Sequence, residues 1–389
     1  MTLRLDSKLP AVGTTIFTVM SKLAADVGAI NLSQGFPDFD CDPALVDAVT
    51  RHMRDSRNQY APMQGVLALR QAIAAKYETF HGRRYDPETE VTVTSGGTEA
   101  IFNAVVSCVH AGDEVIVLEP FYENYGPDAI LAGATPVFVP LERPDWRLDP
   151  DRLRAAFSPR TKAIIVNTPH NPSGRVLTRA ECDLIASLCI EFDAWAITDE
   201  IYEHIRYAGD HHVLATWPGM RDRTVTISGL SKTFSCTGWR LGYAIAPADA
   251  TLPIRKVHDF LTVGAPAPLQ AAGAVAMAFD ADYYNHLALG YRDRRETIGT
   301  ALQAAGFTFT LPEGAYYILA DFSRLSELDD VAFAKWMTRE IGVATVPGSS
   351  FYHDPALGKS LVRFAFCKSR ELLLAAAGRL GAVSAGVGV

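Results

Sequence analysis

Short runs of β-branched and other apolar residues recur along the middle of the chain from about residue 90. They are VTVT at 91, EVIVL at 114, TPVFV at 135, KAIIVN at 162, AWAIT at 194, TVTIS at 224 and GYAIA at 242. Most are apolar at nearly every position, as strands buried on both faces are. They alternate mostly with helical stretches, which predicts an α/β fold with a mainly parallel sheet flanked by helices.

The two ends of the chain show a different pattern. Residues 1–40 read as short, irregular pieces, whereas beyond about residue 282 a long helical pattern is followed by the strand-like pieces GAYYILADF and SLVRFAF. We therefore predict a large domain over residues 45–281 and a smaller α+β domain that combines residues 1–44 with residues 282–389. Small-molecule sites are common where two domains meet.

Composition and charge exclude several classes of partner. The chain has 389 residues, 48% of them hydrophobic, and a net charge of −8, which disfavours nucleic acid as a partner. We see no secretory signal and no apolar run of the roughly 18 residues that a membrane span needs. The six scattered cysteines include no CxxC pair and indicate reduced thiols. We expect a cytoplasmic protein without a membrane partner.

Three histidines, His204, His211 and His212, are close together in the sequence. No carboxylate or cysteine at ligand spacing accompanies them, so we expect a solvated loop and no metal site.

The stretch VTVTSGGTEAIFNAVVSCV combines a strand, a glycine turn and a helix that opens near Thr98. Free N–H groups at a helix N-terminus, beside glycines that a ligand can approach closely, are suited to bind a phosphate. A plain strand–helix turn would have the same pattern, so the motif alone leaves both interpretations open.

Polar residues follow three further strands of the predicted sheet. Asn167 and Asn171 lie in NTPHNPSG, where they bind a ligand or simply form turns beside the prolines. Asp199 ends the strand of AWAITDEIYEHI, either as a helix N-cap or facing a protonated nitrogen of a ligand. Lys232 follows TVTIS among small residues, with the hydroxyls of Ser228 and Ser231 nearby.

Two arginines complete the candidate site. Arg240, eight residues after Lys232, is suited to bidentate phosphate contact. Arg363 lies in the alternating apolar run SLVRFAF, where a half-buried guanidinium needs an anion, either an internal carboxylate or that of a substrate. The pieces in the large domain all lie at or just past predicted strand ends, as the rim of one active site requires.

Taken in order, SGGTEA, NTPHNPSG, ITDEIYEHI, SKTFSCTGWRLGY and VRFAF resemble the class I/II aminotransferases, which are fold-type I enzymes that use pyridoxal 5′-phosphate. INLSQGFPDFD and NQYAPMQGVLALRQAIA narrow the resemblance to the branch with kynurenine–oxoglutarate transaminase and bacterial methionine aminotransferase.

The resemblance implies a role for each matching position. Lys232 matches the lysine that bonds covalently to the cofactor and later acts as the general base. Asp199 matches the carboxylate that pairs with the pyridine nitrogen. Tyr202 and Asn171 match residues that hydrogen-bond the phenolic oxygen, and Asn167 lies beside it. The aromatic stacked on the ring is matched by Tyr122.

The remaining matches concern the phosphate and the substrate. The phosphate cradle is matched by Gly97, Thr98, Ser231 and Arg240. Tyr60 matches a tyrosine that reaches the phosphate of a partner subunit, which implies an obligate homodimer with shared active sites. The α-carboxylate anchor is matched by Arg363 with the Gly35 backbone, and the side-chain pocket by Phe17.

The resemblance implies reversible, ping-pong amino transfer from an amino acid to a 2-oxo acid. Ile16, Phe17, Tyr60 and the small pair Val263–Gly264 indicate a roomy apolar pocket, so methionine, other thioether or aromatic amino acids are the expected donors. A β-lyase acting on cysteine S-conjugates or cystathionine would need the same Lys232 and Asp199. A non-catalytic ligand sensor of the same fold would need a DNA-binding module, for which this acidic chain leaves no room.

Overall fold

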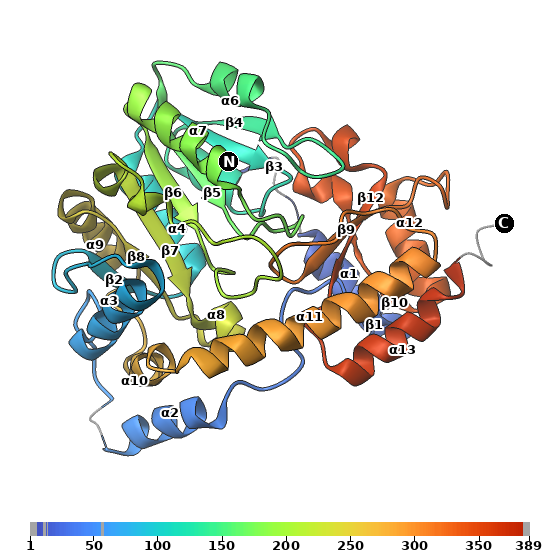
Figure 1. The fold of residues 1–389 in the computed structure, drawn as a ribbon, viewed down its shortest axis with the longest axis horizontal. Helices are drawn as coiled ribbons and strands as arrows, with labels where there is room; N and C mark the ends of the chain where they lie inside the picture. Colours follow the sequence, from blue (N-terminus) through green and yellow to red (C-terminus); the bar gives the residue numbers. More distant parts are fainter. Residues whose placement is uncertain (1–5, 11–12, 14, 56–57, 384–389) are drawn as a thin grey trace, which may run out of the picture.

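The computed structural model describes residues 6–10, 13, 15–55 and 58–383, and Figure 1 shows their arrangement. Within them a seven-stranded sheet has the order β2-β8-β7-β6-β5-β3-β4. Its strands are β2 (Val91–Thr94), β3 (Glu114–Glu119), β4 (Thr135–Pro140), β5 (Thr161–Asn167), β6 (Trp195–Asp199), β7 (Thr224–Gly229) and β8 (Gly242–Ile245). The run from β4 to β7 is parallel, and β8 is antiparallel to both neighbours. The predicted α/β fold with a mainly parallel sheet is confirmed.

Helices cover both faces of this sheet. They are α4 (Gly97–Cys108), α5 (Tyr125–Leu131), α6 (Pro150–Ala156), α7 (Arg179–Glu191) and α9 (Ala248–Thr262). Along β3, Ile116 and Leu118 belong to the apolar cluster under α6 and α7, whereas Val115 and Val117 belong to the cluster under α4, α5 and α9. This alternation explains why the strands are apolar at nearly every position.

A third apolar cluster covers the β2–β8 edge of the sheet. It includes residues of α2 (Pro43–Asp55), α3 (Leu67–His81) and α10 (Ala267–Met277). The short helix α8 (Leu230–Thr233) follows β7 directly. The remaining short helical turns are η1 (Leu214–Thr216), η2 (Arg221–Arg223), η3 (Thr237–Trp239), η4 (Met337–Ile341), η5 (Gly348–Phe351) and η6 (Pro355–Gly358).

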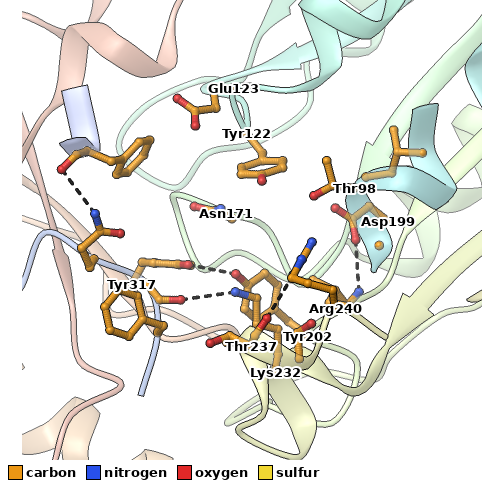
Figure 2. A pocket seen from close by; sticks show the side chains of 18 of the residues that line it. Thr98, Tyr122, Glu123, Asn171, Asp199, Tyr202, Lys232, Thr237, Arg240 and Tyr317 are labelled. Carbon is orange, nitrogen blue, oxygen red and sulfur yellow. Dashed lines mark hydrogen bonds between the residues drawn. The ribbon is translucent and has the colours of Figure 1, made fainter. Parts of the chain in front are cut away.

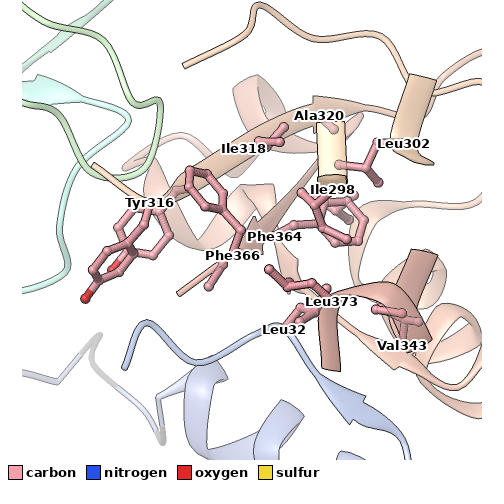
Figure 3. Packing of buried hydrophobic residues seen from close by; sticks show 14 of the residues in the cluster. Leu32, Ile298, Leu302, Tyr316, Ile318, Ala320, Val343, Phe364, Phe366 and Leu373 are labelled. Atoms are coloured by element: carbon pink, nitrogen blue, oxygen red, sulfur yellow. The ribbon is translucent and has the colours of Figure 1, made fainter. Parts of the chain in front are cut away.

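Segments from both ends of the chain pack together beside the large sheet. They are α1 (Ile16–Val27), β1 (Ile30–Asn31), α11 (Ala281–Ala304), β9 (Tyr317–Asp321), α12 (Asp330–Trp336), β10 (Val343–Ala344), β11 (Val346–Pro347), β12 (Leu361–Ala365) and α13 (Arg370–Leu380). β1 pairs with β10, and β12 lies between β11 and β9 in an antiparallel sheet. Figure 3 shows Leu32 packed among side chains of these C-terminal elements.

The predicted domain boundaries fall in the first turns of α2 and α11. The division into residues 1–44 with 282–389 and residues 45–281 stays a prediction. Residues 1–5 and 384–389, at the outer ends of this division, lie outside the described residues. No helix in the described part of the chain is both long and apolar enough to cross a membrane.

The expectation of an irregular segment over residues 1–40 was wrong, because α1 forms there. The Thr15 hydroxyl accepts a hydrogen bond from the N–H of Thr18, and Gly28 ends the helix with a left-handed φ of 66°. Met20 and Ala24, four residues apart, are its buried face. This cap, spacing and terminal glycine are the usual sequence signals of a helix.

The expected solvated loop was wrong for His204 and His211, whereas His212 lies partly exposed in a loop. The His211 Nε2 lies 2.7 Å from a carboxylate oxygen of Glu200, and the side chain of His204 is largely buried against the rings of Phe80 and Tyr284. The two histidines therefore contribute to packing under the sheet. In the part of the chain that the structure describes, no group of three or more histidine, cysteine or acidic side chains is arranged to hold a metal.

An ion pair is buried directly behind the turn that follows β6. The Lys76 ammonium donates to Glu203 Oε1 at 2.5 Å and to the Tyr243 hydroxyl at 3.0 Å, and Ser228 Oγ donates to the same Glu203 oxygen at 2.8 Å. Both charged side chains are almost fully buried. The Lys76 charge holds the pKa of Glu203 well below its usual range, although burial alone would raise that pKa. The pair joins α3 to the turn that carries Tyr202.

Replacing Lys76 by methionine should lower the free energy of unfolding by about 3–5 kcal/mol, because the Glu203 carboxylate would stay buried without its counter-ion. Denaturant unfolding measures this loss. The matched control is Lys22→Met, which removes an exposed ion pair with Asp26 and should cost less than about 1 kcal/mol. Equal effects of the two substitutions would contradict the role given to the buried pair.

Candidate active site

A cavity of about 400 Å³ opens where β6, β7 and the start of α4 meet the small sheet. Twelve residues singled out in the sequence line it: Phe17, Gly35, Gly97, Thr98, Tyr122, Asn171, Asp199, Tyr202, Ser231, Lys232, Arg240 and Arg363. Figure 2 shows many of these side chains turned toward one space although they come from separate elements. Their motifs are far apart in the sequence, and the fold gathers them at one place.

Lys232 lies in α8 at the floor of this cavity. Its Nζ donates to the Gly35 carbonyl at 3.2 Å and lies 5.8 Å and 5.6 Å from the ring centres of Tyr202 and Tyr316. Burial, assisted by the positive charge of Arg240, lowers the pKa of Lys232 to about 8. About a tenth of this amine is therefore neutral, and so nucleophilic, at pH 7, far more than for an ordinary lysine.

Asp199 is the buried last residue of β6. Its Oδ2 accepts a hydrogen bond from the Tyr125 hydroxyl at 2.7 Å, and its Oδ1 accepts one from the Ile201 N–H at 3.3 Å. Burial raises the pKa of this carboxyl, and no cation of the described chain forms an ion pair with it. A turn follows instead of a helix, so the N-cap interpretation does not apply.

The two asparagines of NTPHNPSG have different positions. Asn167 lies below the cavity, where its Nδ2 donates to the Asp199 carbonyl at 2.8 Å and its Oδ1 accepts from the Asn171 N–H at 2.7 Å. Asn171 reaches the cavity itself and accepts a hydrogen bond from Arg363. Asn167 therefore holds Asn171 and Asp199 in place.

The glycine turn before α4 leaves space that a side chain would fill. Gly96 has φ of 93°, and a Cβ built on it would lie 2.5 Å from the Arg240 Nη2. Gly97 and Thr98 begin α4, and Ser231 also lines the cavity. Helix N–H groups, two hydroxyls and a guanidinium thus surround one space, as a phosphate site requires. Ser228 is turned away toward Glu203.

Arg363 of β12 is almost completely buried, with 2% of its surface exposed. Its Nη1 donates to Asn171 Oδ1 at 3.0 Å and its Nη2 to the Ser33 carbonyl at 2.9 Å. Its Nε is buried without a hydrogen-bond partner, and no described carboxylate forms an ion pair with it. The internal salt bridge considered from the sequence is therefore absent from the described residues, and the guanidinium is available to an external anion.

Aromatic rings and one glycine shape the cavity around Arg363. The rings of Phe17 and Tyr317 lie 5.0 Å and 4.2 Å from its guanidinium carbon. The Tyr317 hydroxyl is 2.9 Å from that of Tyr202. A Cβ at Gly35 would lie 2.2 Å from the Tyr317 hydroxyl, so only glycine fits there. Tyr122 faces the cavity in Figure 2.

Of the predicted site residues, Tyr60 lies outside this cavity, and 86% of its surface is exposed. Ile16 packs into the apolar clusters, and Val263 is half exposed, so neither lines the cavity within one chain. The sequence reasoning missed Tyr125, Tyr317 and Glu123. Tyr125 and Glu123 stand in the same EPFYENY motif as Tyr122, and the motif was the available signal for both.

The model of the family "Aminotransferase class I and II" matches residues 27–380. The chain belongs to this family. Class I and II aminotransferases use pyridoxal 5′-phosphate to move an amino group between an amino acid and a 2-oxo acid. The resemblance seen in the sequence motifs is thereby confirmed, and so is the transaminase activity inferred from it.

Similar aminotransferases cover nearly the whole chain. Methionine aminotransferase of Escherichia coli is 43% identical over 96% of this chain and 97% of its own length. Kynurenine–oxoglutarate transaminase 3 of Rattus norvegicus is 37% identical, with coverage of 95% and 88%. The structure of N-succinyldiaminopimelate aminotransferase from Mycobacterium tuberculosis superposes with a TM-score of 0.95 at 40% identity, covering 98% of this chain and 100% of that one.

In the cofactor-free protein, Lys232 should react with an amine reagent with a half-maximal rate near pH 8, because its lowered pKa exposes the neutral amine there. Pulse acetylation at a series of pH values, read by mass spectrometry, gives this midpoint. Arg240→Gln removes a neighbouring positive charge and should move the midpoint to higher pH. A midpoint near 10.4, the ordinary lysine value, would contradict the environment described for Lys232.

Proposed function

We propose that this aminotransferase binds pyridoxal 5′-phosphate in the cavity described above and takes large neutral amino acids, such as methionine, other thioether and aromatic amino acids, as donors. One observation carries the proposal. Three buried or partly buried charges, Lys232, Asp199 and Arg363, face a single cavity, and none forms an ion pair with another described residue. Buried charges need partners, and a cofactor with its substrate would provide all three.

The residues fit the cofactor chemically. Asp199 would hold the proton of the pyridine nitrogen, and Tyr125 with Ile201 would keep its carboxylate oriented. Gly97, Thr98, Ser231 and Arg240 would bind the phosphate, with Gly96 leaving the room for it. Asn171 and Tyr202 would hydrogen-bond the phenolic oxygen, while Tyr122 would stack on the ring. When bound, pyridoxal phosphate accepts the electrons that remain when the substrate's α-proton leaves.

Lys232 and Arg363 would carry out the steps at the substrate. Arg363, which lines the cavity and has no ion-pair partner among the described residues, would bind the α-carboxylate, assisted by Asn171 and the Gly35 backbone. This fixes the orientation of the Cα–H bond. Lys232, with its pKa of about 8, would then accept the proton from Cα as a neutral amine and return it.

The preference for large neutral donors is supported by the walls of the cavity. Phe17 and Ile101 supply apolar surface, and the cavity has no cation besides Lys232, Arg240 and Arg363 among its described lining residues. The similarity to methionine aminotransferase, at 43% identity, points the same way. Apolar pockets discriminate weakly between similar side chains, so we expect several neutral donors.

L-Methionine added to the cofactor-loaded protein, without a 2-oxo acid, should convert the absorption of the lysine-bound cofactor to that of its aminated form. Lys232→Ala should still bind the cofactor but lose this conversion by at least about a thousandfold, because the group that moves the proton is gone. Retained conversion in Lys232→Ala would refute the role of Lys232. Release of pyruvate and ammonia from S-substituted cysteines without a 2-oxo acid would instead identify a β-lyase.

We further propose a homodimer in which Tyr60 reaches the phosphate of the partner subunit. Tyr60 is exposed, and the neighbouring end of α9 exposes Phe260, Leu261 and Val263, with 93% of Phe260 accessible. The two segments lie side by side, since a Cβ at Gly264 would be 3.7 Å from the Ala61 carbonyl oxygen. Apolar surface of this kind marks protein interfaces.

Sedimentation equilibrium at micromolar protein should give twice the mass of one chain. Phe260→Asp should shift the protein toward monomers and weaken cofactor binding at the same time, since each site would lose its Tyr60. As a control, Leu289→Asp alters another exposed apolar side chain, 61% accessible, on α11. A monomeric wild-type protein with full activity would contradict the dimer.

A further inference from the structure

Glu123 lines the cavity, but no step proposed above uses it. It lies in the turn between β3 and α5, immediately after Tyr122. In the view of Figure 2, Glu123 lies beyond Tyr122 from Lys232, at the part of the cavity away from the amine. Because Lys232 acts at the α-carbon of the substrate in the proposed function, we place Glu123 at the end of the cavity toward which the substrate's side chain would extend.

The carboxylate of Glu123 is partly buried and has no hydrogen bond or ion pair with a described residue. Burial raises the pKa of Glu123, and the positive charge of Arg363 opposes that shift. The charges of Glu123 and Arg363 thus interact across the cavity, although the two side chains form no ion pair. A negative charge close to the substrate pocket is left without a protein counter-ion.

The backbone around Glu123 is fixed from both sides. The Phe121 N–H donates to the Phe351 carbonyl at 2.8 Å, and the Tyr125 N–H donates to the Tyr122 carbonyl at 3.3 Å. Tyr125 is held in turn by its bond to Asp199. These bonds restrain the backbone on either side of Glu123, so its carboxylate would move mainly by rotation of its own side chain.

The three cations of the cavity already have roles in the proposed function. Arg240 would bind the phosphate, Arg363 the α-carboxylate, and Lys232 carries the proton. The wall of the cavity also includes the apolar side chains of Phe17, Phe36 and Ile101. A second carboxylate on a substrate would find Glu123 in the described wall and no free cation.

We infer that Glu123 makes the cavity selective against a second carboxylate, so that both the amino donor and the 2-oxo acid acceptor carry uncharged side chains. The inference rests on the proposed function, because the two substrates of a ping-pong reaction occupy the same cavity in turn. Two like charges in a partly buried site repel each other, and this repulsion discriminates between partners of similar size. 2-Oxo acids with uncharged side chains should accordingly be better acceptors than 2-oxoglutarate.

The test compares kcat/KM for L-glutamate and L-methionine in the half-reaction of the cofactor-loaded protein. Glu123→Gln keeps the size of the side chain and removes its charge, so the glutamate-to-methionine ratio should rise by about tenfold. Glu123→Ala should also raise the glutamate-to-methionine ratio, and it replaces the glutamine variant in the test if that variant does not fold. The matched control is Glu327→Gln, an exposed acid distant in sequence, which should leave the ratio unchanged.

A binding measurement separates selectivity from chemistry. Glutarate and pentanoate differ by one carboxylate, and each can occupy the Arg363 site without reacting. Calorimetric titration of the cofactor-loaded protein should show that pentanoate binds more tightly than glutarate. The ratio of the two dissociation constants should fall by about tenfold in Glu123→Gln.

The outcomes distinguish the two proposals. If none of the neutral amino acids converts the cofactor of the wild-type protein to its aminated form, the proposed function fails. If methionine reacts but Glu123→Gln and Glu123→Ala leave both the substrate ratio and the binding difference unchanged, the specificity role of Glu123 is overturned. Wild-type turnover of glutamate as efficient as that of methionine would overturn it as well.

Discussion

The buried carboxylate of Asp199 is the constraint around which the site is built. A carboxylate at the end of a central strand loses its hydration, and burial raises its pKa. The Tyr125 hydroxyl and the Ile201 N–H donate hydrogen bonds to this carboxylate, and the Asn167 side chain donates one to the backbone carbonyl of Asp199. These groups come from α5, the turn after β6 and β5. The positive charge that would complete the site is left to a ligand, which is why the cofactor assignment follows from this residue.

Arg363, on the other side of the cavity, is a buried cation that needs an anionic ligand. Its guanidinium is buried on β12, and its partners are a side chain of the large sheet region, Asn171, and a backbone carbonyl near the chain start, Ser33. The association of β1 with β10 and the packing of Leu32 bring that early segment to the arginine. The proposed substrate anchor thus depends on both ends of the chain.

The distribution of charge across the cavity links catalysis with selectivity. Burial and the positive charge of Arg240 lower the pKa of Lys232, and Arg240 would also bind the phosphate, so one cation would serve both the cofactor and the base. The Glu123 carboxylate occupies the remaining wall with the opposite sign. The same cavity can therefore hold one carboxylate firmly through Arg363 and disfavour a second.

The local hydrophobic pattern alone predicted the strands of the large sheet and the motifs that follow them. Short apolar runs rich in β-branched residues favour strands covered on both faces, and Asp199, Lys232 and Asn171 follow such runs at a common edge, so their convergence was predictable. The helix α1 was missed although its cap, its apolar spacing and its terminal glycine were all present in the sequence. His204 and His211 were assigned to solvent because their partners, Tyr284 and Glu200, were not recognisable as neighbours of a short loop.

Only the tertiary structure decided which polar groups find partners inside the protein. Ser228 and Ser231 are three residues apart and chemically alike, yet one is turned to Glu203 and the other to the cavity. The unpartnered Arg363 Nε and the unpaired Glu123 carboxylate were equally invisible, since the absence of a partner depends on every segment that packs nearby. Sequence determines which chemistry is available, whereas long-range packing decides which charges remain for a substrate.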